Sequence, residues 1–236
     1  MTSLRLRKPA RAAIAALLAL SGAAFAAPAA SAATPHFFGP QQHSWGGHPF
    51  SGDSNWGGYV AQGSGFKSIS GSWTMPDVQC NTSNDLFAPW IGIDGYGSQT
   101  VEQTGVQADC SSGSPVYSGW YEMYPAAPVY FNNPVSAGDT FNASVVNTSG
   151  RSYTLTLTDV TQGWTKTTKQ SLRAQDVSAE AVIESPTQSY PSFNELDFSN
   201  LTVNGQAFDN YGPQSMDSGP YTETQLQNGA FSIIPG

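Results

Sequence analysis

Apolar and polar side chains alternate with a period of two along many short segments of the chain after residue 54. This alternation is typical of β-strands that bury one face, and Gly, Pro, Asn and Asp separate the segments as turn residues do. The segments are rich in Thr, Val, Tyr and Trp, which favour strands, and none after residue 35 has a helical period. We expect strands at residues 55–62, 68–75, 88–95, 98–106, 118–125, 140–147, 152–160, 164–170, 178–185, 196–203 and 230–235.

So many regularly spaced strands predict an all-β domain over residues 54–236, an antiparallel β-sandwich of the jelly-roll type with two packed sheets. Residues 33–53 differ, because they are rich in Gly, Pro, His and Gln and lack the alternation. We expect this stretch to be a short pro-segment or flexible leader.

Residues 1–32 have the pattern of a secretory signal peptide. Four basic residues precede an apolar run rich in Ala and Leu, and Ala-x-Ala sites follow at residues 24–26 and 30–32. The run is too short and too poor in Leu to favour a membrane anchor. We therefore expect a secreted, extracellular protein whose mature form has no membrane segment.

The charge balance excludes one class of partner. Without residues 1–32, five basic residues stand against seventeen acidic ones, a net charge near −12. Nucleic acid is an unsuitable partner, because phosphate binding needs clustered cations. Few cations also leave little self-repulsion once the carboxyl groups are protonated, so the composition suits an acidic environment.

The cysteines and histidines narrow the possible chemistry. Cys80 and Cys110 are the only cysteines, and in an exported protein such a pair predicts a disulfide. His36, His43 and His48 all precede residue 50. A Ser-His-Asp or Cys-His site, or a zinc site, is therefore nearly excluded unless the amino-terminal segment folds back into it. Carboxyl and amide groups are then the remaining candidates for acid–base catalysis. We expect neither a metal nor a cofactor.

Several expected strands carry unusual side chains on the face that does not enter the core. Within 90–94, Ile91 and Ile93 share the core face and leave Trp90, Gly92 and Asp94 on the other. Trp, Tyr, Glu and Gln together are more typical of a groove lining than of a solvated face. The same alternation groups Trp120, Glu122 and Tyr124 opposite Tyr121 and Met123, groups Gln99, Val101, Gln103 and Gly105, and puts both Glu180 and Glu184 on one face.

Five motifs in a fixed order resemble the glutamic peptidase family, the eqolisins. They are NWGGYV (55–60), WIGIDG (90–95), EQTGV (102–106), WYEMYP (120–125) and AEAVIE (179–184), and the resemblance covers roughly residues 54–236. It implies a concanavalin-like sandwich of two antiparallel seven-stranded sheets. It also implies cleavage of polypeptides in acid without metal or histidine, and we expect a monomer.

The resemblance assigns roles by position. It implies that Gln103 and Glu184 are catalytic, and that Glu180 is a neighbour with a supporting or solvated role. Ser118 and Gln107 stand where fungal members have Asp, which leaves substrate preference and pH optimum open. The implied substrate-binding residues are Trp56, Trp90, Asp94, Trp120, Tyr121 and Glu122.

Such a pair suits peptide hydrolysis, which needs an activated water, a partner for the oxyanion and a proton for the leaving nitrogen. Ionised Glu184 would take the proton of the water and pass it to the amine. Gln103 would hold the water by its carbonyl oxygen and donate to the oxyanion at any pH, because an amide does not titrate.

Two other functions fit the same faces. A jelly-roll glycoside hydrolase would use Glu122 and Glu184 as its carboxyl pair, and a carbohydrate-binding module would use the Trp-rich face without chemistry. The leader poses a further question, since it holds all three histidines. One hypothesis is that it covers the groove in weak acid and loosens in stronger acid; the alternative is a spacer with incidental histidines.

Overall fold

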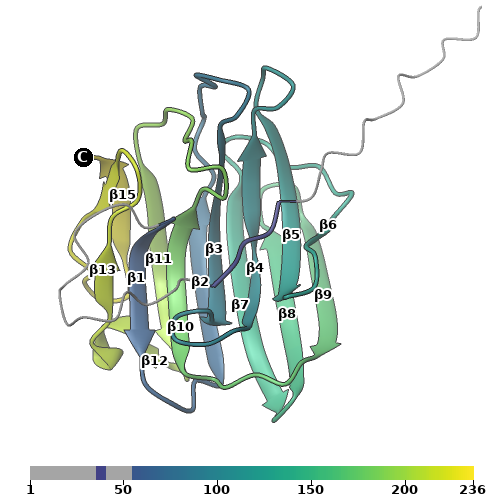
Figure 1. Ribbon diagram of the computed structural model, residues 1–236, viewed down its shortest axis with the longest axis vertical. Coiled ribbons are helices and arrows are strands. Elements are labelled where there is room, and N and C mark those ends of the chain that lie inside the picture. Colours follow the sequence, from purple (N-terminus) through teal and green to yellow (C-terminus); the bar gives the residue numbers. More distant parts are fainter. Residues whose placement is uncertain (1–35, 41–54) are drawn as a thin grey trace, which may run out of the picture. The chain divides into compact units, whose positions relative to one another are not determined.

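The computed structural model describes residues 36–40 and 55–236 of the chain. The expected signal peptide at 1–32 and most of the leader, including His43 and His48, lie outside the described residues. Two antiparallel sheets face each other, which confirms the predicted β-sandwich (Figure 1). In the described ranges no helix is both long and apolar enough to cross a membrane.

The first sheet has seven strands in the order β13-β1-β10-β3-β4-β5-β6. Its strands come from four separate stretches of the sequence, 56–62, 86–130, 178–184 and 214–216, so motifs that are far apart along the chain become neighbours. The bounds are β1 Trp56–Gln62, β3 Leu86–Asp94, β4 Val101–Asp109, β5 Val116–Tyr124, β6 Val129–Tyr130, β10 Ser178–Glu184 and β13 Gln214–Met216.

The second sheet has eight strands, seven in the order β14-β15-β11-β2-β7-β8-β9 and the short β12 beside β11. The expectation of two seven-stranded sheets is therefore wrong by this one strand. A single turn of 3-10 helix, Phe208–Tyr211, follows β12. The bounds are β2 Ser68–Thr74, β7 Thr140–Ser149, β8 Ser152–Asp159, β9 Trp164–Ser171, β11 Leu196–Val203, β12 Gln206–Ala207, β14 Tyr221–Glu223 and β15 Phe231–Pro235.

The second sheet has one apolar and one polar face. In β8, Leu155 and Leu157 enter the main core between the sheets, and the threonines between them face outward. Thr156 and Thr158 meet Thr167 and Thr165 of β9, with hydroxyl oxygens 3.3 and 3.0 Å apart. The alternating pattern thus gives this sheet the ordinary arrangement of a half-solvated β-sheet.

The first sheet is buried on both faces at its centre. Every residue of β3, β4 and β10 is buried. One face packs in the main core, and the other carries a second group of buried side chains, which we call the cleft cluster. Its members are Phe38, Trp56, Val60, Ala88, Trp90, Tyr96, Val101, Trp120, Val182 and Met216.

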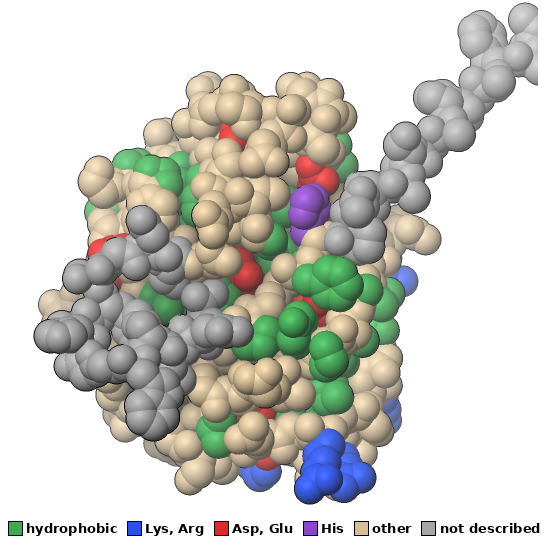
Figure 2. Space-filling view, viewed as in Figure 1, with side chains coloured by type: hydrophobic (Ala, Val, Ile, Leu, Met, Phe, Trp, Pro, Cys, Tyr) green, Lys and Arg blue, Asp and Glu red, His purple; other side chains and the backbone are tan. Residues whose placement is uncertain are grey.

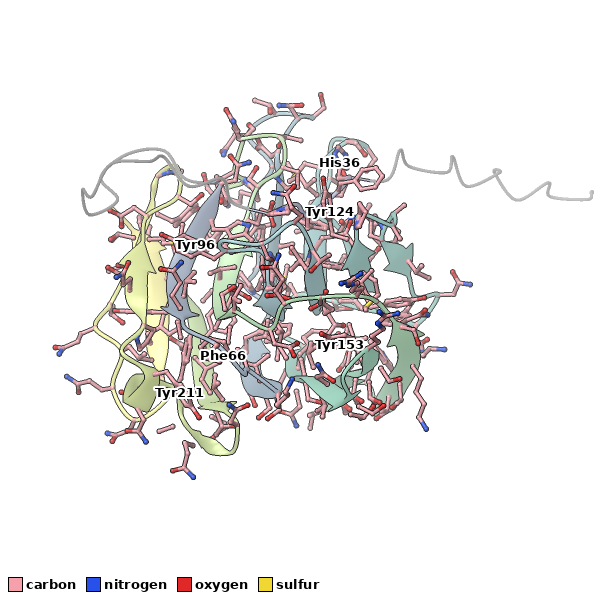
Figure 3. All side chains as sticks on the ribbon, turned by 60° about the horizontal axis from the view of Figure 1, so that its bottom comes forward. His36, Phe66, Tyr96, Tyr124, Tyr153 and Tyr211 are labelled. Carbon is pink, nitrogen blue, oxygen red and sulfur yellow. A yellow bond between two sulfur atoms is a disulfide. The ribbon has the colours of Figure 1, made fainter. Side chains whose placement is uncertain are left out.

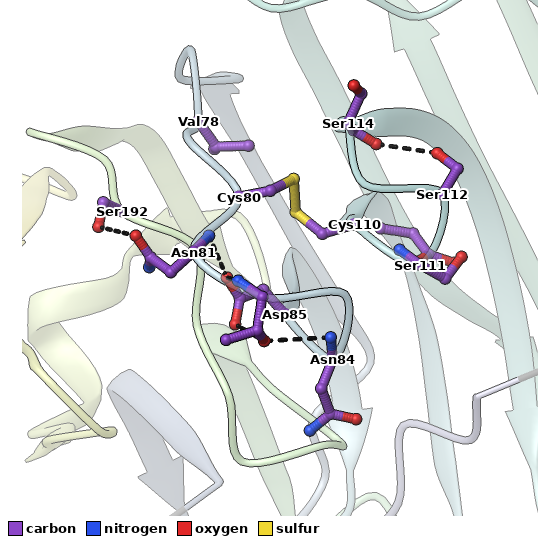
Figure 4. Close-up of a disulfide and its surroundings, with 12 residues drawn as sticks. Val78, Cys80, Asn81, Asn84, Asp85, Cys110, Ser111, Ser112, Ser114 and Ser192 are labelled. Carbon is purple, nitrogen blue, oxygen red and sulfur yellow. Dashed lines mark hydrogen bonds between the residues drawn. A yellow bond between two sulfur atoms is a disulfide. The ribbon is translucent and has the colours of Figure 1, made fainter.

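The predicted disulfide is present and ties the β2–β3 connection to the end of β4 (Figure 4). The Cα atoms of Cys80 and Cys110 are 5.6 Å apart. Beside it, Asp85 accepts hydrogen bonds from the Ser189 hydroxyl at 2.7 Å and from the backbone of Asn81 and Thr82. Burial opposes its charge, but these donors prevail and lower the pKa of Asp85.

Candidate active site

Gln103 and Glu122 are cross-strand partners on the face of the first sheet that bears the cleft cluster. They are paired in the register of β4 and β5, and Gln103 is also paired with Gly92 of β3. The Gln103 Nε2 donates to Glu122 Oε2 at 2.8 Å. The carbonyl oxygen of Gln103 is buried and has no hydrogen-bond partner among the described residues, so it is left as a free acceptor.

Glu184 reaches the same face from the last position of β10. Its neighbour in the register is Trp56 of β1, and Trp90 of β3 donates its indole N–H to Glu184 Oε2 at 3.2 Å. Trp56 also hydrogen-bonds to Glu184, and the two indole rings meet edge to face at 4.8 Å. The tryptophans therefore fix the carboxyl group and cover it with apolar surface.

Two glycines let the Trp90 indole lie close to the backbone of the sheet. A Cβ atom at Gly105 would come within 2.4 Å of the Pro89 carbonyl oxygen and 2.5 Å of the Trp90 Cβ. At Gly92 a Cβ would lie 2.9 Å from the Trp90 ring and 3.1 Å from the Gln103 Cβ. Real Cβ atoms do not approach so closely, so both positions require glycine to hold Trp90 and Gln103 in place.

Residues 36–40 run obliquely across the strands on this face (purple in Figure 1). The Phe38 N–H donates to Glu122 Oε2 at 3.1 Å, and Gln103 Nε2 donates to the Phe38 carbonyl oxygen at 2.5 Å. The backbone of Gly39 hydrogen-bonds to Glu184. One peptide group of the chain thus lies between Gln103 and Glu184.

The Phe38 side chain fills the cleft cluster. Its ring stacks on the Trp120 indole with centroids 4.2 Å apart and planes 8° apart, and the residue is 0% exposed. The adjacent Phe37 is 47% exposed, and His36 is visible on the surface of this face (Figure 2). The segment enters over β6, where the backbone of His36 hydrogen-bonds to the Tyr130 hydroxyl.

Burial raises the pKa of both carboxyl groups in the cleft. The pKa of Glu122 rises to about 8, because burial outweighs the hydrogen bonds from Phe38 and Gln103. The pKa of Glu184 rises well above its ordinary value, first through burial and then through the nearby Glu122 charge. The donors Trp56, Trp90 and Gly39 act in the opposite direction. With residues 36–40 in place, Glu122 is therefore neutral in acid, whereas Glu184 keeps donors that favour its ionised form.

The structure brings six of the eight expected site residues together: Gln103, Glu184, Trp56, Trp90, Trp120 and Glu122. It places Tyr121 on the opposite face, where the ring stacks on Phe131 at 6.0 Å and the hydroxyl accepts from Gln170. The assignment of Tyr121 to the groove is therefore wrong, because neighbouring positions of a pleated strand point to opposite faces.

Asp94 also lies apart from these contacts, at the end of β3. The residue has a φ of 66°, and its carboxylate accepts hydrogen bonds from the backbone N–H groups of residues 175–177 at 2.8–2.9 Å. Asp94 thus holds the loop that leads into β10. Glu180 shares the face of Glu184 as expected, but it is 0% exposed, so the solvated role considered for it is wrong.

A second acidic group lies at this end of the sandwich, and it was not expected from the sequence. Carboxylate oxygens of Asp94, Glu102 and Asp176 lie within 4.8 Å of one another. Asp176 accepts from Asn147 and from the Tyr153 hydroxyl, labelled in Figure 3, and forms an ion pair with Lys67. Because Asp94 and Asp176 are already bound by protein donors and Lys67 supplies a positive charge, we do not assign a cation to this group.

Sequence reasoning also missed Phe38 and Tyr130. The available signal was the adjacent aromatic pair Phe37 and Phe38 in a leader rich in Gly, Pro, His and Gln. Tyr130 lies on β6, which has only two residues and no detectable period.

Comparisons with known proteins agree with this fold. Residues 54–233 match the Peptidase A4 family. Scytalidopepsin B of Scytalidium lignicola is 37% identical over 47% of this chain and 42% of its own length. Aspergillopepsin-2 of Aspergillus niger is 30% identical over 47% of this chain and 46% of its own length. The matches thus span less than half of these relatives.

Solved structures give a longer match. A crystal structure of scytalido-glutamic peptidase with a transition-state analogue inhibitor has a TM-score of 0.69 and 25% identity. It covers 78% of this chain and 98% of that one. Aspergilloglutamic peptidase from Aspergillus niger, at 21% identity and a TM-score of 0.51, covers 64% and 99% and supports the fold.

Proposed function

The chain belongs to the Peptidase A4 family, the eqolisin peptidases, and on this premise we propose that it is a secreted endopeptidase that hydrolyses polypeptides in acid. Gln103 and Glu184 are its catalytic pair. The proposed export rests on the signal-like residues 1–32, and the disulfide is compatible with an oxidising compartment.

One observation carries the proposal. A peptide group of residues 38–39 has its carbonyl oxygen at the Gln103 amide and its nitrogen at the Glu184 carboxyl. These are the positions at which peptide hydrolysis needs an oxyanion donor and a proton carrier. The amide acts at every pH, which a second carboxyl group would not do.

The proposed reaction uses groups of this chain and a water molecule. The free carbonyl oxygen of Gln103 orients the water, and ionised Glu184 takes its proton as the oxygen attacks the peptide carbon. Gln103 Nε2 stabilises the oxyanion, and Glu184 then protonates the leaving nitrogen. The indole N–H groups of Trp56 and Trp90 favour the ionised form of Glu184 against burial.

The other lining residues bind substrate in this proposal. Trp120 offers a flat apolar surface, and Glu122 accepts a hydrogen bond from substrate backbone, as it does from Phe38. A glycoside hydrolase would need Glu122 as a reacting acid. Here Glu122 is bound to Gln103, and the family and the structural neighbours are peptidases, so this alternative and the binding-module alternative are not favoured.

The test compares Gln103→Ala, Glu184→Gln and Glu180→Gln in the cleavage of a denatured protein at about pH 4, near the ordinary pKa of a carboxyl group. Loss of the general base should reduce turnover by about 100- to 10,000-fold, and loss of the oxyanion donor by about 100- to 1,000-fold. Glu180→Gln is the matched control and should retain turnover, because Glu180 lies on the same face of the same strand but outside the contacts with residues 38–39.

Circular dichroism would verify that each variant is folded. Full activity of either Gln103→Ala or Glu184→Gln would refute the catalytic pair. Hydrolysis of a β-glucan in place of the denatured protein would refute the peptidase.

A further inference from the structure

Residues 36–40 occupy the cleft with the contacts that an extended substrate would make. From β6 to β10 the segment meets Tyr130, Glu122, Gln103 and Glu184 in turn, so its contacts come from four strands of the sheet. It belongs to the same compact unit as the sandwich. A segment that merely blocked the cleft would have no need to place one peptide group at both catalytic side chains.

We propose that residues 36–40 are bound as a substrate, and that the same molecule hydrolyses its own Phe38–Gly39 bond, so that the working enzyme begins at Gly39. This inference rests on the function proposed above. It adds the position of the cut and the side chain that directs it.

The bond is identified by the atoms on either side of it. Gln103 Nε2 lies 2.5 Å from the Phe38 carbonyl oxygen, and the Gly39 backbone meets Glu184. The Phe38 N–H is held by Glu122, so the residue before the bond is fixed at both its backbone groups. The neighbouring Phe37–Phe38 bond lacks this pairing, because its nitrogen is the Phe38 N–H, which is bound to Glu122 rather than Glu184.

The Phe38 side chain sets the register. Its ring lies flat on Trp120 and is fully buried in the cleft cluster, whereas Phe37 is half exposed. Sliding the segment by one residue would remove this ring from the cluster and put a glycine or a solvent-facing side chain there. Burial of one aromatic side chain is enough to select one register by about tenfold or more.

The reaction is balanced by one water molecule. Its oxygen joins the Phe38 carbonyl carbon, the C–N bond breaks, and Glu184 transfers a proton to the Gly39 nitrogen. The product has a new carboxyl group at Phe38, beside Glu122 and Glu184. The cut also removes the covalent link between Phe38 and the sandwich, so the leader is no longer held at high effective concentration and can leave the cleft.

The hypothesis that histidines attract the leader is not needed for this binding. In the described part of the leader, the contacts are made by backbone groups and by the Phe38 ring, and His36 takes part through its backbone.

To test the proposal, the full chain is purified and brought to about pH 4, where carboxyl groups titrate. Intact mass and amino-terminal sequencing follow the leader, while digestion of an added denatured protein is measured in parallel. We expect a new terminus at Gly39 in the wild type, formed with a half-time that does not depend on protein concentration. The Glu184→Gln variant should keep its leader.

Two leader variants give a matched comparison. Phe38→Gly should slow the cut between residues 38 and 39 by about tenfold or more, because the buried ring is lost. Phe37→Gly removes an equal ring that is exposed and should change the rate by less than about threefold, as expected for a surface side chain. A synthetic peptide of residues 34–42, TPHFFGPQQ, should be cut by the mature enzyme between its second Phe and Gly.

The proposal is overturned if the wild type digests the added protein but keeps its leader or is cut at another bond. It is also overturned if the rate of the cut rises with protein concentration, which would mean cleavage between molecules. If the added protein is not digested at all, the proposed function fails and this inference fails with it.

Discussion

Glu102 gives the sharpest test of how this fold responds to pH, because it is buried in the sandwich and takes no part in the proposed reaction. It is paired with Ile93 and Met123 in the register of the first sheet, and both of these lie in the main core. Burial first, and then the nearby charge of Asp94, raise its pKa from 4.5 to about 9. The folded protein therefore holds a proton that the unfolded chain releases near pH 4.5.

The linkage between proton binding and folding gives the sign and the size of the effect of pH on the free energy of unfolding. A group whose pKa is raised by folding contributes its full stability below its unfolded pKa and loses it as pH rises toward the folded value. Each pH unit within that interval costs about 1.4 kcal/mol, so between pH 4.5 and 7 Glu102 alone should lower the free energy of unfolding by about 3 kcal/mol. That is a large share of the ~5–15 kcal/mol of a typical domain.

The perturbation is Glu102→Gln, which keeps the shape of the neutral acid but cannot ionise. Guanidinium unfolding of both proteins at about pH 4.5 and 7, in a Glu184→Gln background that prevents self-digestion, gives the two free energies. Between pH 4.5 and 7, the free energy of unfolding should fall by about 3 kcal/mol less in Glu102→Gln than in the protein that keeps Glu102. This difference corresponds to about 6–12 °C in melting temperature for a domain of this size.

Glu195→Gln serves as the control, because Glu195 is exposed, and it should leave the pH dependence unchanged. The reasoning is refuted if wild type and Glu102→Gln lose stability equally between the two pH values. Equal losses would mean that Glu102 does not hold its proton in the folded state.

Other predictions concern the cleft and the disulfide. Glu122→Gln should keep proteolysis in acid within about tenfold, since Gln resembles the neutral acid that burial maintains there; loss of all activity would instead point to Glu122 as a reacting acid. Pepstatin, which targets two aspartates that share a proton, should not inhibit the enzyme, and strong inhibition in a protein-digestion assay would argue for an aspartic mechanism. Replacing Cys80 and Cys110 by Ser should lower the free energy of unfolding by about 3–4 kcal/mol, because the bond closes a loop with a sequence separation of 30; an unchanged denaturation midpoint would contradict this.

The sequence predicted strands well wherever one face is solvated. In residues 152–159 the alternation of Leu with Thr gave both the strand and its faces, because only one side of that strand is buried. All eleven expected strands are present, although 98–106 is observed at Val101–Asp109. The short strands β6, β12, β13 and β14 were not expected, since two or three residues cannot display a period.

Some residues of the site were placed correctly from the sequence and others were not, and individual residues show why. Trp90 and Glu184 were placed on the correct face, because β3 and β10 remain extended through them. Asp94 was not, because its positive φ ends the strand there and its carboxylate binds the loop that leads into β10. Glu102 followed the alternation into the core, but nothing in the sequence says that a buried acid is tolerated as its neutral form. Phe38 lies in a stretch without a period, so only three-dimensional contacts reveal it.

The path of residues 36–40 across the strands has a consequence for how selectivity can change. Successive positions of a chain bound in this way meet different strands: His36 meets Tyr130 on β6, Phe38 meets Trp120 on β5 and Gln103 on β4, and Gly39 meets Glu184 on β10. A substitution on one strand should then alter the preference at one position of the substrate and leave the others intact. If the substrate instead paired along one edge strand, all of its positions would contact that same strand, and a substitution there would alter the preference at several positions. The transverse path therefore makes the preferences separable, so that they can be selected or engineered one at a time.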